Sequence, residues 1–532
     1  MRPQPGLTRV RLRIRDADGW PTGLRLRVSD DRGTYWPPLG HLPVPDEAAR
    51  SAGDLVLGDG GAVPFELHAL VHDGEEIDLA PGRYRFSGRR GFESELLRLQ
   101  VDITDAEGQV VELLLRRFAD LGAEGWYSGD THVHHPDPAG IRYEMECEDL
   151  RVCSLLVMKG GLPDPPRPGE GVFWNVEHFT GGLASASDER YLIQVGEEFR
   201  HRRLAHLVMQ DLRSIVWPVS TGGPPESGVG GFDWPLMWHA AGEAHGQGAL
   251  VSWAHWPYPS MEAPLDIALG RIDSIDLLTV GNPFEPHPEL TEIYGMAGPE
   301  VYSLPPIEVY YHYLACGFRL AVTAGSDKMG PYPPLGGART YVRTRGGLSY
   351  VSWVDGIREG RTFVSTYPLL EVSVDEQGPG ATVALDGQAR LPVIATAVSL
   401  EPYDVLEVVH DGLVVASAQP IGARHEARID TVLDVDRSGW IAARAHGRTM
   451  LEYGRTWRRI PVFAHSSPIY LARPGRPAAA ATSARLFLEQ LGDLERWLDR
   501  EAHLPTPADR VEAQALIDRA VAVYRRLAHG GE

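Results

Sequence analysis

Apolar residues occupy every second position in the first part of the chain. They do so from Val10 to Ile14, where they alternate with arginines, and again from Leu24 to Val28. This period of two predicts half-buried strands, and the Asp18-Gly19 pair between the two runs predicts a hairpin turn. Similar strand patterns continue up to about residue 118. We therefore expect residues 1–118 to form a small antiparallel β-sandwich.

The pattern changes from about residue 119. Short continuous apolar runs replace the alternation, and helical or Pro/Gly-rich stretches separate them. Runs of this kind are typical of parallel strands that are buried on both faces. We expect residues 119–370 to form a barrel of strands and helices, with two surface loops where proline and glycine are dense. The expected strands lie at 152–158, 192–198, 249–254, 274–280 and 319–324, and the loops at 163–169 and 222–228.

The last part of the chain contains two further patterns. A residue pattern typical of strands returns over residues 371–473. Asp411-Gly412 separates two apolar runs there and predicts a hairpin. Leucines then fall on one helical face from Leu488 to Leu498, and a second apolar stripe runs from Leu516 to Leu527. We expect a second β-sandwich, followed by a helical hairpin over residues 474–532. The hairpin buries its stripes against the rest of the chain or against a second copy, so a homo-oligomer stays open.

The charge balance excludes one large class of partner. Lys plus Arg number 51 and Asp plus Glu number 72, so the chain carries a net charge of −21. This charge repels phosphate backbones, and we expect no binding to nucleic acid. The length of 532 residues and the apolar share of 43% are those of a multidomain globular protein, and they allow an enzyme of the α/β class.

Cysteine usage and hydropathy indicate the cytoplasm. Three scattered cysteines, Cys147, Cys153 and Cys316, are too few for a disulfide framework or a cysteine-rich zinc site. The first residues lack an apolar stretch of the signal-peptide type, and no later segment has the roughly 18 consecutive apolar residues of a membrane helix. We therefore expect a cytoplasmic protein without a membrane partner.

Two histidines in Gly129-Asp130-Thr131-His132-Val133-His134 are the first candidates for chemistry. Residues two apart on a strand point to the same face, so His132 and His134 can both reach one metal ion with neutral imidazoles. Taken alone, the pair is better explained by two hydrogen-bonded histidines on a strand. Further potential ligands end three of the predicted strands. They are Glu198 in Gly196-Glu197-Glu198, His255 in Ser252-Trp253-Ala254-His255, and Asp327 in Gly325-Ser326-Asp327.

These side chains are expected to meet, because the carboxyl ends of barrel strands converge on one mouth. Histidine nitrogen and carboxylate oxygen together suit zinc, manganese or iron. The absence of cysteine argues against a structural zinc site. The set of residues therefore predicts a site for divalent metal ions at the mouth of the barrel, and it is far more specific than any one of its members.

In these motifs the chain resembles the polymerase-and-histidinol-phosphatase (PHP) superfamily of metallohydrolases, and most closely its CehA/McbA-type branch. The resemblance covers residues 120–370 and includes the later segment 356–364. It implies a distorted seven-stranded barrel, (β/α)7, flanked by the two β-sandwich domains and followed by the helical hairpin. It also implies a multinuclear metal site and the hydrolysis of phosphate esters or, in this branch, of carbamate-type esters.

The resemblance also assigns roles to single residues. Carried over by motif, His132 and His134 would bind the first metal, Glu198 would bridge, and His255 and Asp327 would complete the site. A further ligand follows from the same comparison. His206, eight residues after Glu198, matches a histidine that often follows the paired glutamates of the family.

Two departures from the family pattern bear on the number of metals. Met329 stands two positions after Asp327, where the family has a histidine. Leu156-Val157-Met158-Lys159-Gly160 stands where a Thr-Asp-His-Asn segment is usual. His178 is either a substitute for one lost ligand or a surface histidine. We expect one to three divalent ions (Zn, Mn or Fe), with one or two favoured over three.

The sequence therefore predicts a metal-dependent hydrolase of an ester bond, either a phosphoester or a carbamate or carboxyl ester of a small molecule. A divalent metal lowers the pKa of bound water to about 7 and so supplies hydroxide at neutral pH. Asp130 and Lys328 are the candidate catalytic residues. The Lys328 ammonium would stabilise developing negative charge, or else it is a solvated loop lysine. The alternative function is a non-catalytic metal- or carbohydrate-binding protein with a degenerate PHP site.

Overall fold

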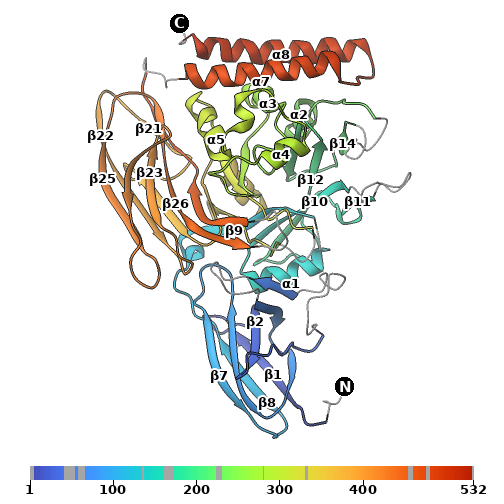
Figure 1. Cartoon of the computed structure of the whole chain (residues 1–532), viewed down its shortest axis with the longest axis vertical. Helices are drawn as coiled ribbons and strands as arrows, with labels where there is room; N and C mark the ends of the chain where they lie inside the picture. Colours follow the sequence, from blue (N-terminus) through green and yellow to red (C-terminus); the bar gives the residue numbers. More distant parts are fainter. Residues whose placement is uncertain are drawn as a thin grey trace.

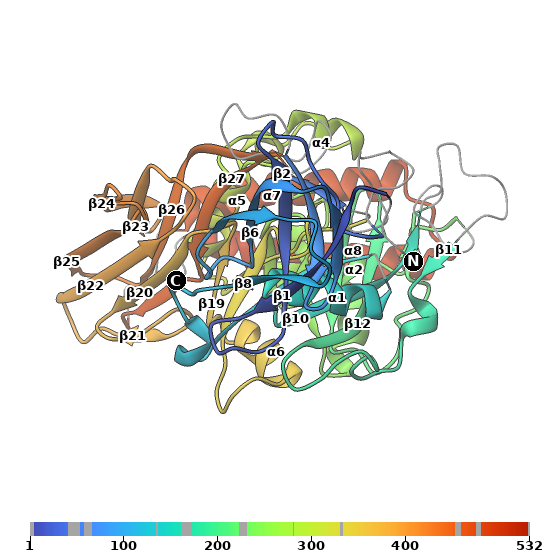
Figure 2. The same cartoon turned by 90° about the horizontal axis from the view of Figure 1, so that it is seen from below.

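The computed structural model describes residues 5–40, 54–57, 66–134, 137–160, 172–222, 231–279, 281–329, 333–452, 459–474 and 480–529. Within them the chain is a mixed α/β structure in which strands outnumber helices. The N-terminal strands form one end of the molecule, and the last two helices form the other (Figure 1). A central sheet with its helices lies between them. The strands that follow residue 369 lie along one side of this central part (Figures 1 and 2).

The N-terminal strands enclose one apolar core between two sheets. They are β1 (Thr8–Arg15), β2 (Gly23–Asp30), β3 (Asp54–Leu57), β4 (Glu66–His72), β5 (Glu76–Leu79), β6 (Gly82–Arg89), β7 (Leu97–Ile103) and β8 (Gln109–Leu114). β1 pairs with β5 and β8, whereas β2 pairs with β4 and β6. Leu12 of β1 and Leu26 of β2 both point into the shared core, so the two strands face each other and do not share an edge.

The predicted hairpin of the first two strands forms only at its turn, where Asp16 N donates to the carbonyl oxygen of Trp20 at 3.0 Å and Arg15 bridges Pro21, and its pairing does not continue into β1 and β2. Their alternation shows which face is buried, and the apolar face of β1 and the apolar face of β2 are both buried as predicted. The prediction of a wholly antiparallel arrangement is wrong, because β1 and β8 run parallel. The two strands lie in different sheets because each apolar face completes one half of the same core.

The predicted strands of the central part are all present. They are β10 (Val152–Gly160), β12 (Leu192–His201), β15 (Leu250–Trp253), β16 (Ser274–Leu278) and β17 (Ala321–Ala324). Beside them lie β9 (Trp126–Val133), β11 (Val172–Trp174), β13 (Ala205–Gln210), β14 (Ser220–Thr221), β18 (Arg339–Arg343) and β19 (Thr362–Ser365). Parallel pairing joins β9 to β10, β10 to β12, β15 to β16 and β16 to β17. The predicted loop at 163–169, residues 223–228 of the second predicted loop, and residue 280 lie outside the described residues.

Three central strands depart from the predicted parallel order: β11 runs antiparallel to β10, β18 runs antiparallel to β9 and β19, and β13 is the one that shapes the site. β13 runs antiparallel between β12 and β15. The chain reverses in a tight turn, where His201 Nδ1 accepts hydrogen bonds from the backbone N–H groups of Arg203 and Leu204, each at 3.1 Å. Because of this reversal, β13 begins at the edge of the sheet where β12 ends. The reversal brings His206, the second residue of β13, back toward Glu198 on β12.

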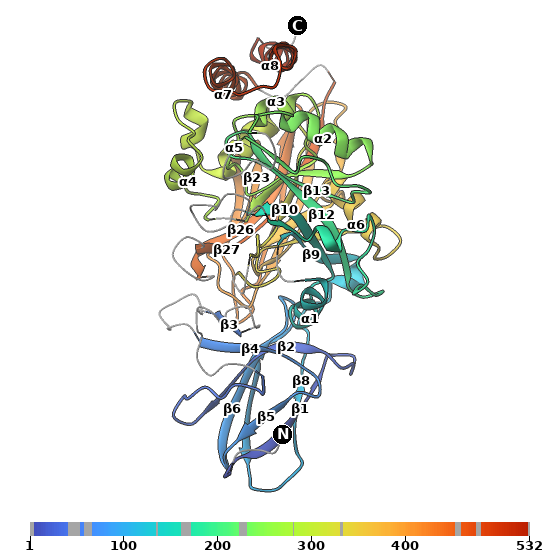
Figure 3. The ribbon, with the colours of Figure 1, turned by 90° about the vertical axis from the view of Figure 1, so that its right-hand side faces the viewer.

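Helices cover the central sheet and close one end of the molecule (Figures 1 and 3). They are α1 (Pro138–Glu148), α2 (Met237–Gly246), α3 (Ala263–Ala268), α4 (Pro288–Ile293), α5 (Pro306–Ala315), α6 (Tyr350–Arg358), α7 (Ala481–Arg500) and α8 (Pro507–Ala528). The last two pack against each other and against α3, with the predicted apolar positions Leu491, Leu498 and Leu516 buried. None of the helices in the described part of the chain is both long and apolar enough to cross a membrane.

The C-terminal strands continue the central sheet. They are β20 (Leu369–Val374), β21 (Thr382–Ala384), β22 (Ala389–Val398), β23 (Val405–His410), β24 (Leu413–Ala418), β25 (Ala427–Val435), β26 (Gly439–Glu452), β27 (Arg459–Ser466) and β28 (Ile469–Ala472). β27 pairs with β19 of the central part, and β20, β22 and β25 form a separate sheet. The predicted hairpin at Asp411-Gly412 is confirmed. β23 and β24 pair across it, and both turn residues have positive φ, at 50° and 85°.

A buried ion pair joins the N-terminal sheets to the central part. Arg25 of β2 contacts Glu148, the last residue of α1, through Nε to Oε1 at 2.7 Å and Nη2 to Oε2 at 2.9 Å. The two side chains are only 2% and 1% exposed. Arg25→Met is expected to lower the free energy of unfolding by about 3–5 kcal/mol, because the Glu148 carboxylate then stays buried without this cation.

Calorimetry of the thermal transition measures this effect. Arg27→Met, on the same strand and partly exposed, is the control and is expected to change stability by less than about 1 kcal/mol. The double variant Arg25→Met/Glu148→Met is expected to recover most of the loss, since both charges are then replaced by apolar side chains. A double variant as unstable as the single one would contradict the electrostatic explanation.

Candidate metal centre

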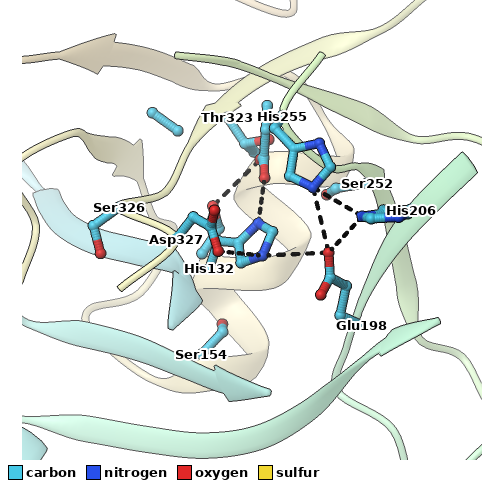
Figure 4. A network of polar contacts seen from close by, with 12 residues as sticks. His132, Ser154, Glu198, His206, Ser252, His255, Thr323, Ser326 and Asp327 are labelled. Carbon is cyan, nitrogen blue, oxygen red and sulfur yellow. Dashed lines mark hydrogen bonds and ion pairs between the residues drawn. The ribbon is translucent and has the colours of Figure 1, made fainter. Parts of the chain in front are cut away.

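The six predicted ligands come from strands far apart in the sequence and meet at one end of the central sheet. Figure 4 shows five of them, His132, Glu198, His206, His255 and Asp327. In chain order the six ligands are His132 on β9, His134 just after it, Glu198 on β12, His206 on β13, His255 after β15 and Asp327 after β17. All are buried. They form two groups of three residues, and within each group the potential ligand atoms lie within 4.8 Å of one another.

The first group consists of His132, His134 and Asp327. The two imidazoles face each other, with 3.0 Å between their Nε2 atoms. Asp327 Oδ1 lies 3.5 Å from His132 Nε2 and 3.4 Å from His134 Nε2. Two nitrogens and one oxygen therefore converge on one point, as the His-x-His spacing on β9 predicts.

The second group consists of Glu198, His206 and His255. Glu198 Oε1 lies 3.2 Å from His206 Nδ1 and 3.4 Å from His255 Nε2. The two ring nitrogens are 3.0 Å apart. The antiparallel course of β13 makes this group possible, because it returns His206 to the edge at which β12 ends.

Glu198 also reaches the first group. Its Oε1 atom lies 3.6 Å from His132 Nε2, and its Oε2 atom lies 3.5 Å from His134 Nε2. The carboxylate thus stands between the two groups with one oxygen near each histidine of the first. This is the placement of a carboxylate that bridges two ions.

The backbone at the strand ends is shaped to aim these ligands. His255 and Asp327 have positive φ, at 31° and 47°. Residues in this region are costly unless the surroundings hold them, and they cluster at functional sites. Gly325 lets its segment pass close to β9, because a Cβ there would lie 2.3 Å from His132 Cβ and 2.7 Å from its backbone nitrogen.

The sequence analysis missed Asp276, which orients a ligand from behind. This carboxylate lies on β16, and its Oδ2 atom is 3.4 Å from His132 Nδ1. Its Oδ1 atom accepts hydrogen bonds from the hydroxyls of Thr131 at 3.3 Å and Thr323 at 2.5 Å. A carboxylate behind a metal-binding histidine fixes the ring and its tautomer. The available signal was an acidic residue inside the apolar run Ser274-Ile275-Asp276-Leu277-Leu278.

Burial and neighbouring charges keep most of the ligands in the protonation state that binds a cation. Burial alone would raise the pKa of Glu198, but Arg200 and the imidazoles of His206, His255 and His132 hold it well below its usual value. Burial and the charge of Arg200 lower the pKa of His206 to about 4, and burial lowers that of His134. These groups are an ionised carboxylate and neutral imidazoles at neutral pH, which are the forms that bind metal.

The residues present fit divalent metal ions. Imidazole nitrogens 3.0 Å apart in a buried site can share one proton, and when that proton is released their two lone pairs converge on one point. Glu198 Oε2 is buried without a hydrogen-bond partner, which is costly unless another group completes it. Three nitrogen or oxygen ligands per group match sites of zinc, manganese or iron.

The two predicted catalytic residues lie beside the ligands, and each contacts other groups of the chain. Asp130 is fully buried and accepts hydrogen bonds from the backbone N–H groups of His132 at 3.1 Å, Ser326 at 2.9 Å and Gly336 at 2.8 Å. It therefore holds the backbone of both segments of the first group. Its oxygens face these backbone N–H groups, and Asp130 belongs to neither group of potential ligands among the described residues.

Lys328 is neither a solvated lysine nor turned toward the ligands. Its side chain is 1% exposed, and its ammonium contacts Glu144 of α1 at 3.2 Å and the carbonyl oxygen of Pro333 at 3.4 Å. Its carbonyl oxygen accepts a hydrogen bond from His134 N at 2.9 Å. His178, the candidate substitute ligand, is partly exposed beside Glu177 and belongs to neither group.

Metal binding is expected to release about one proton per chain at pH 7–8. Burial opposes protonation of His132, but Asp327, Asp276 and Glu198 raise the pKa of this imidazole to about 9. Below that pH the metal must displace a proton, so log K should rise with pH by about one per pH unit and level off near pH 9. Calorimetric titration with Mn²⁺ in two non-chelating buffers of different ionisation enthalpy counts the protons. A pH-independent affinity between pH 6 and 8 would contradict this account of His132.

No protein-family model and no curated protein matches the chain. Among solved structures, the chain is similar to a two-domain protein from Bacteroides vulgatus described as containing a predicted PHP-like metal-dependent phosphoesterase. The two chains are 14% identical and superpose with a TM-score of 0.30, over 60% of this chain and 90% of the other. At this level of likeness, the function has to be argued from the geometry of the site itself.

Proposed function

We propose that this protein is a metal-dependent hydrolase that cleaves an ester bond with metal-activated water. One observation carries the proposal: Glu198 stands between two buried groups that each offer three ligands. With Glu198 shared, the first group would offer four ligands and the second three, and a site with three protein ligands leaves a position for water or substrate. Two such groups with a shared carboxylate fit a pair of ions that act on one substrate.

The residues of the chain would divide the work as follows. Bound divalent ions would supply water of lowered pKa and polarise the ester oxygen. Asp276, behind His132, keeps Nε2 of that ring directed at the site. The buried position of the ligands limits bulk water and strengthens every charge interaction. The ions would be held by His132, His134 and Asp327 and by Glu198, His206 and His255.

We further propose the PHP superfamily and its (β/α)7 barrel for residues 119–370, and a CehA/McbA-type substrate range of phosphoesters or of carbamate or carboxyl esters. The order of ligands along the chain supports this, from His132-Val133-His134 through Glu198 and His206 to Asp327. The flanking regions 1–118 and 371–473 would be β-sandwich domains and 474–532 a helical hairpin. We expect action on a small molecule in the cytoplasm.

Metal content and turnover together test the proposal. The purified protein is analysed for transition metals, then reconstituted with Zn²⁺, Mn²⁺ or Fe²⁺ and assayed on aryl phosphates, aryl carbamates and aryl acetates. About two equivalents of metal per chain and metal-dependent hydrolysis of one class are expected. Less than one equivalent per chain, with no turnover after reconstitution, would favour a non-catalytic binding protein.

A further inference from the structure

A cationic side chain stands next to the shared carboxylate on β12. Arg200 follows Glu198 by two residues on this strand, so both side chains point to the same face. Arg200 Nε lies 3.6 Å from Glu198 Oε2, and the Arg200 side chain is 14% exposed. Arg200 is therefore one step nearer the end of the strand than the metal ligand, at the rim of the site.

Arg200 also contacts an apolar side chain. Its Nη1 atom lies 3.7 Å from Met158 Sδ on β10. Met158 pairs with Trp174 on β11, and the Trp174 ring lies 6.4 Å from the ring of His134. Met158 thus connects Arg200 to Trp174, which lies beside the ligand His134.

A cation in this position opposes the binding of metal ions. It would lie close to both ions in a buried site, where like charges repel strongly. Arg200 keeps the Glu198 carboxylate ionised, but it would also repel the ions that this carboxylate binds. A negatively charged group bound between the ions and the guanidinium would be attracted by both, and arginine forms paired hydrogen bonds to such groups.

We infer that Arg200 is a specificity-determining residue that binds the anionic group of a negatively charged ester beside the two ions. The inference rests on the proposed function and narrows its substrate class. Trp174 and Met158 would pack against the apolar part of the same substrate. Neutral esters would reach the ions without using Arg200.

Inorganic phosphate binding is the direct test, since it needs no turnover. Arg200→Met, Arg200→Lys and the wild type are loaded with Mn²⁺, their metal content is measured, and phosphate is titrated by calorimetry. Arg200→Met is expected to bind phosphate about 10- to 100-fold more weakly at unchanged metal content. Arg200→Lys should lie between, because lysine keeps the charge but not the paired hydrogen bonds. Arg213→Met, which removes an exposed arginine of the loop after β13, is the matched control.

Activity gives an independent measurement. Arg200→Met is expected to raise KM for p-nitrophenyl phosphate about 10- to 100-fold and to leave KM for p-nitrophenyl acetate within about threefold. Unchanged phosphate affinity would overturn the inference, and so would loss of metal from Arg200→Met, which would mean that Arg200 positions Glu198. If the wild type binds phosphate through Arg200 but cleaves no ester, the proposed function fails and the anion site stands.

Discussion

Glu198→Gln is expected to dismantle both halves of the metal centre and to abolish metal-dependent turnover. The Glu198 carboxylate lies 3.2–3.6 Å from ring nitrogens of His132, His134, His206 and His255. Glutamine has almost the same volume, but it carries no charge and offers an amide N–H₂ where one oxygen stood. Because residues behind the ligands already change metal affinity 10- to 100-fold, loss of the shared ligand should cost at least about 100-fold.

The measurement is metal per chain after dialysis, with turnover on the responsive ester. Glu197→Gln is the matched control, since Glu197 precedes Glu198 and is equally buried. Glu197 Oε2 accepts a hydrogen bond from Val216 N at 2.8 Å, and burial raises the pKa of Glu197 well above its usual value. Glutamine therefore resembles the neutral form of Glu197, so the metal content of Glu197→Gln should equal that of the wild type. Equal losses in both variants would indicate damage to β12, and full metal content in Glu198→Gln would refute the shared carboxylate.

The central strands could be predicted because burial on both faces leaves an unbroken apolar run. β12 and β17 lie where such runs lie, and the ligands at their ends follow from the run boundaries. The pattern of apolar residues does not show in which direction a strand runs. β13 is buried along its whole length, as a parallel strand would be, so its antiparallel course could not be inferred. The pairing of β1 and β2 was missed for a related reason: alternation identifies the buried face but not the neighbour at the edge.

Some residues of the candidate site could likewise be predicted from the sequence, and others could not. Five ligands were predictable from residue type and strand position and His206 from the family resemblance alone, and the structure brings the six together. The orienting carboxylate of Asp276 has no spacing relation to the ligands, because its partner His132 is 144 positions away. Lys328 was assigned by adjacency to Asp327, but its ammonium pairs with Glu144 on α1. Neighbours in an extended chain point to opposite sides, so adjacency to a ligand does not bring a side chain into the site.

Asp130→Ala is expected to remove one of the two ions and leave the other. Asp130 accepts hydrogen bonds from the backbone N–H groups of His132, Ser326 and Gly336, at 3.1, 2.9 and 2.8 Å. These bonds fix β9 against the segment that carries Asp327, so they hold the first ligand group together. The second group takes no part in them. Without the carboxylate, three buried N–H groups lose their acceptor, and the first group should lose about 10- to 100-fold in metal affinity.

Titration with Co²⁺, followed by its visible absorption, separates the two sites. The wild type should bind two equivalents tightly, whereas Asp130→Ala should bind one tightly and one weakly. Asp130→Asn provides a graded comparison, because its amide oxygen can still accept from His132 and Ser326 while its N–H₂ faces the N–H of Gly336. The affinity of Asp130→Asn for the more weakly bound Co²⁺ ion should therefore lie between those of the wild type and Asp130→Ala. A general loss of stability would weaken both sites together, so loss of both ions from a folded variant, or of neither, would refute the positioning role of Asp130.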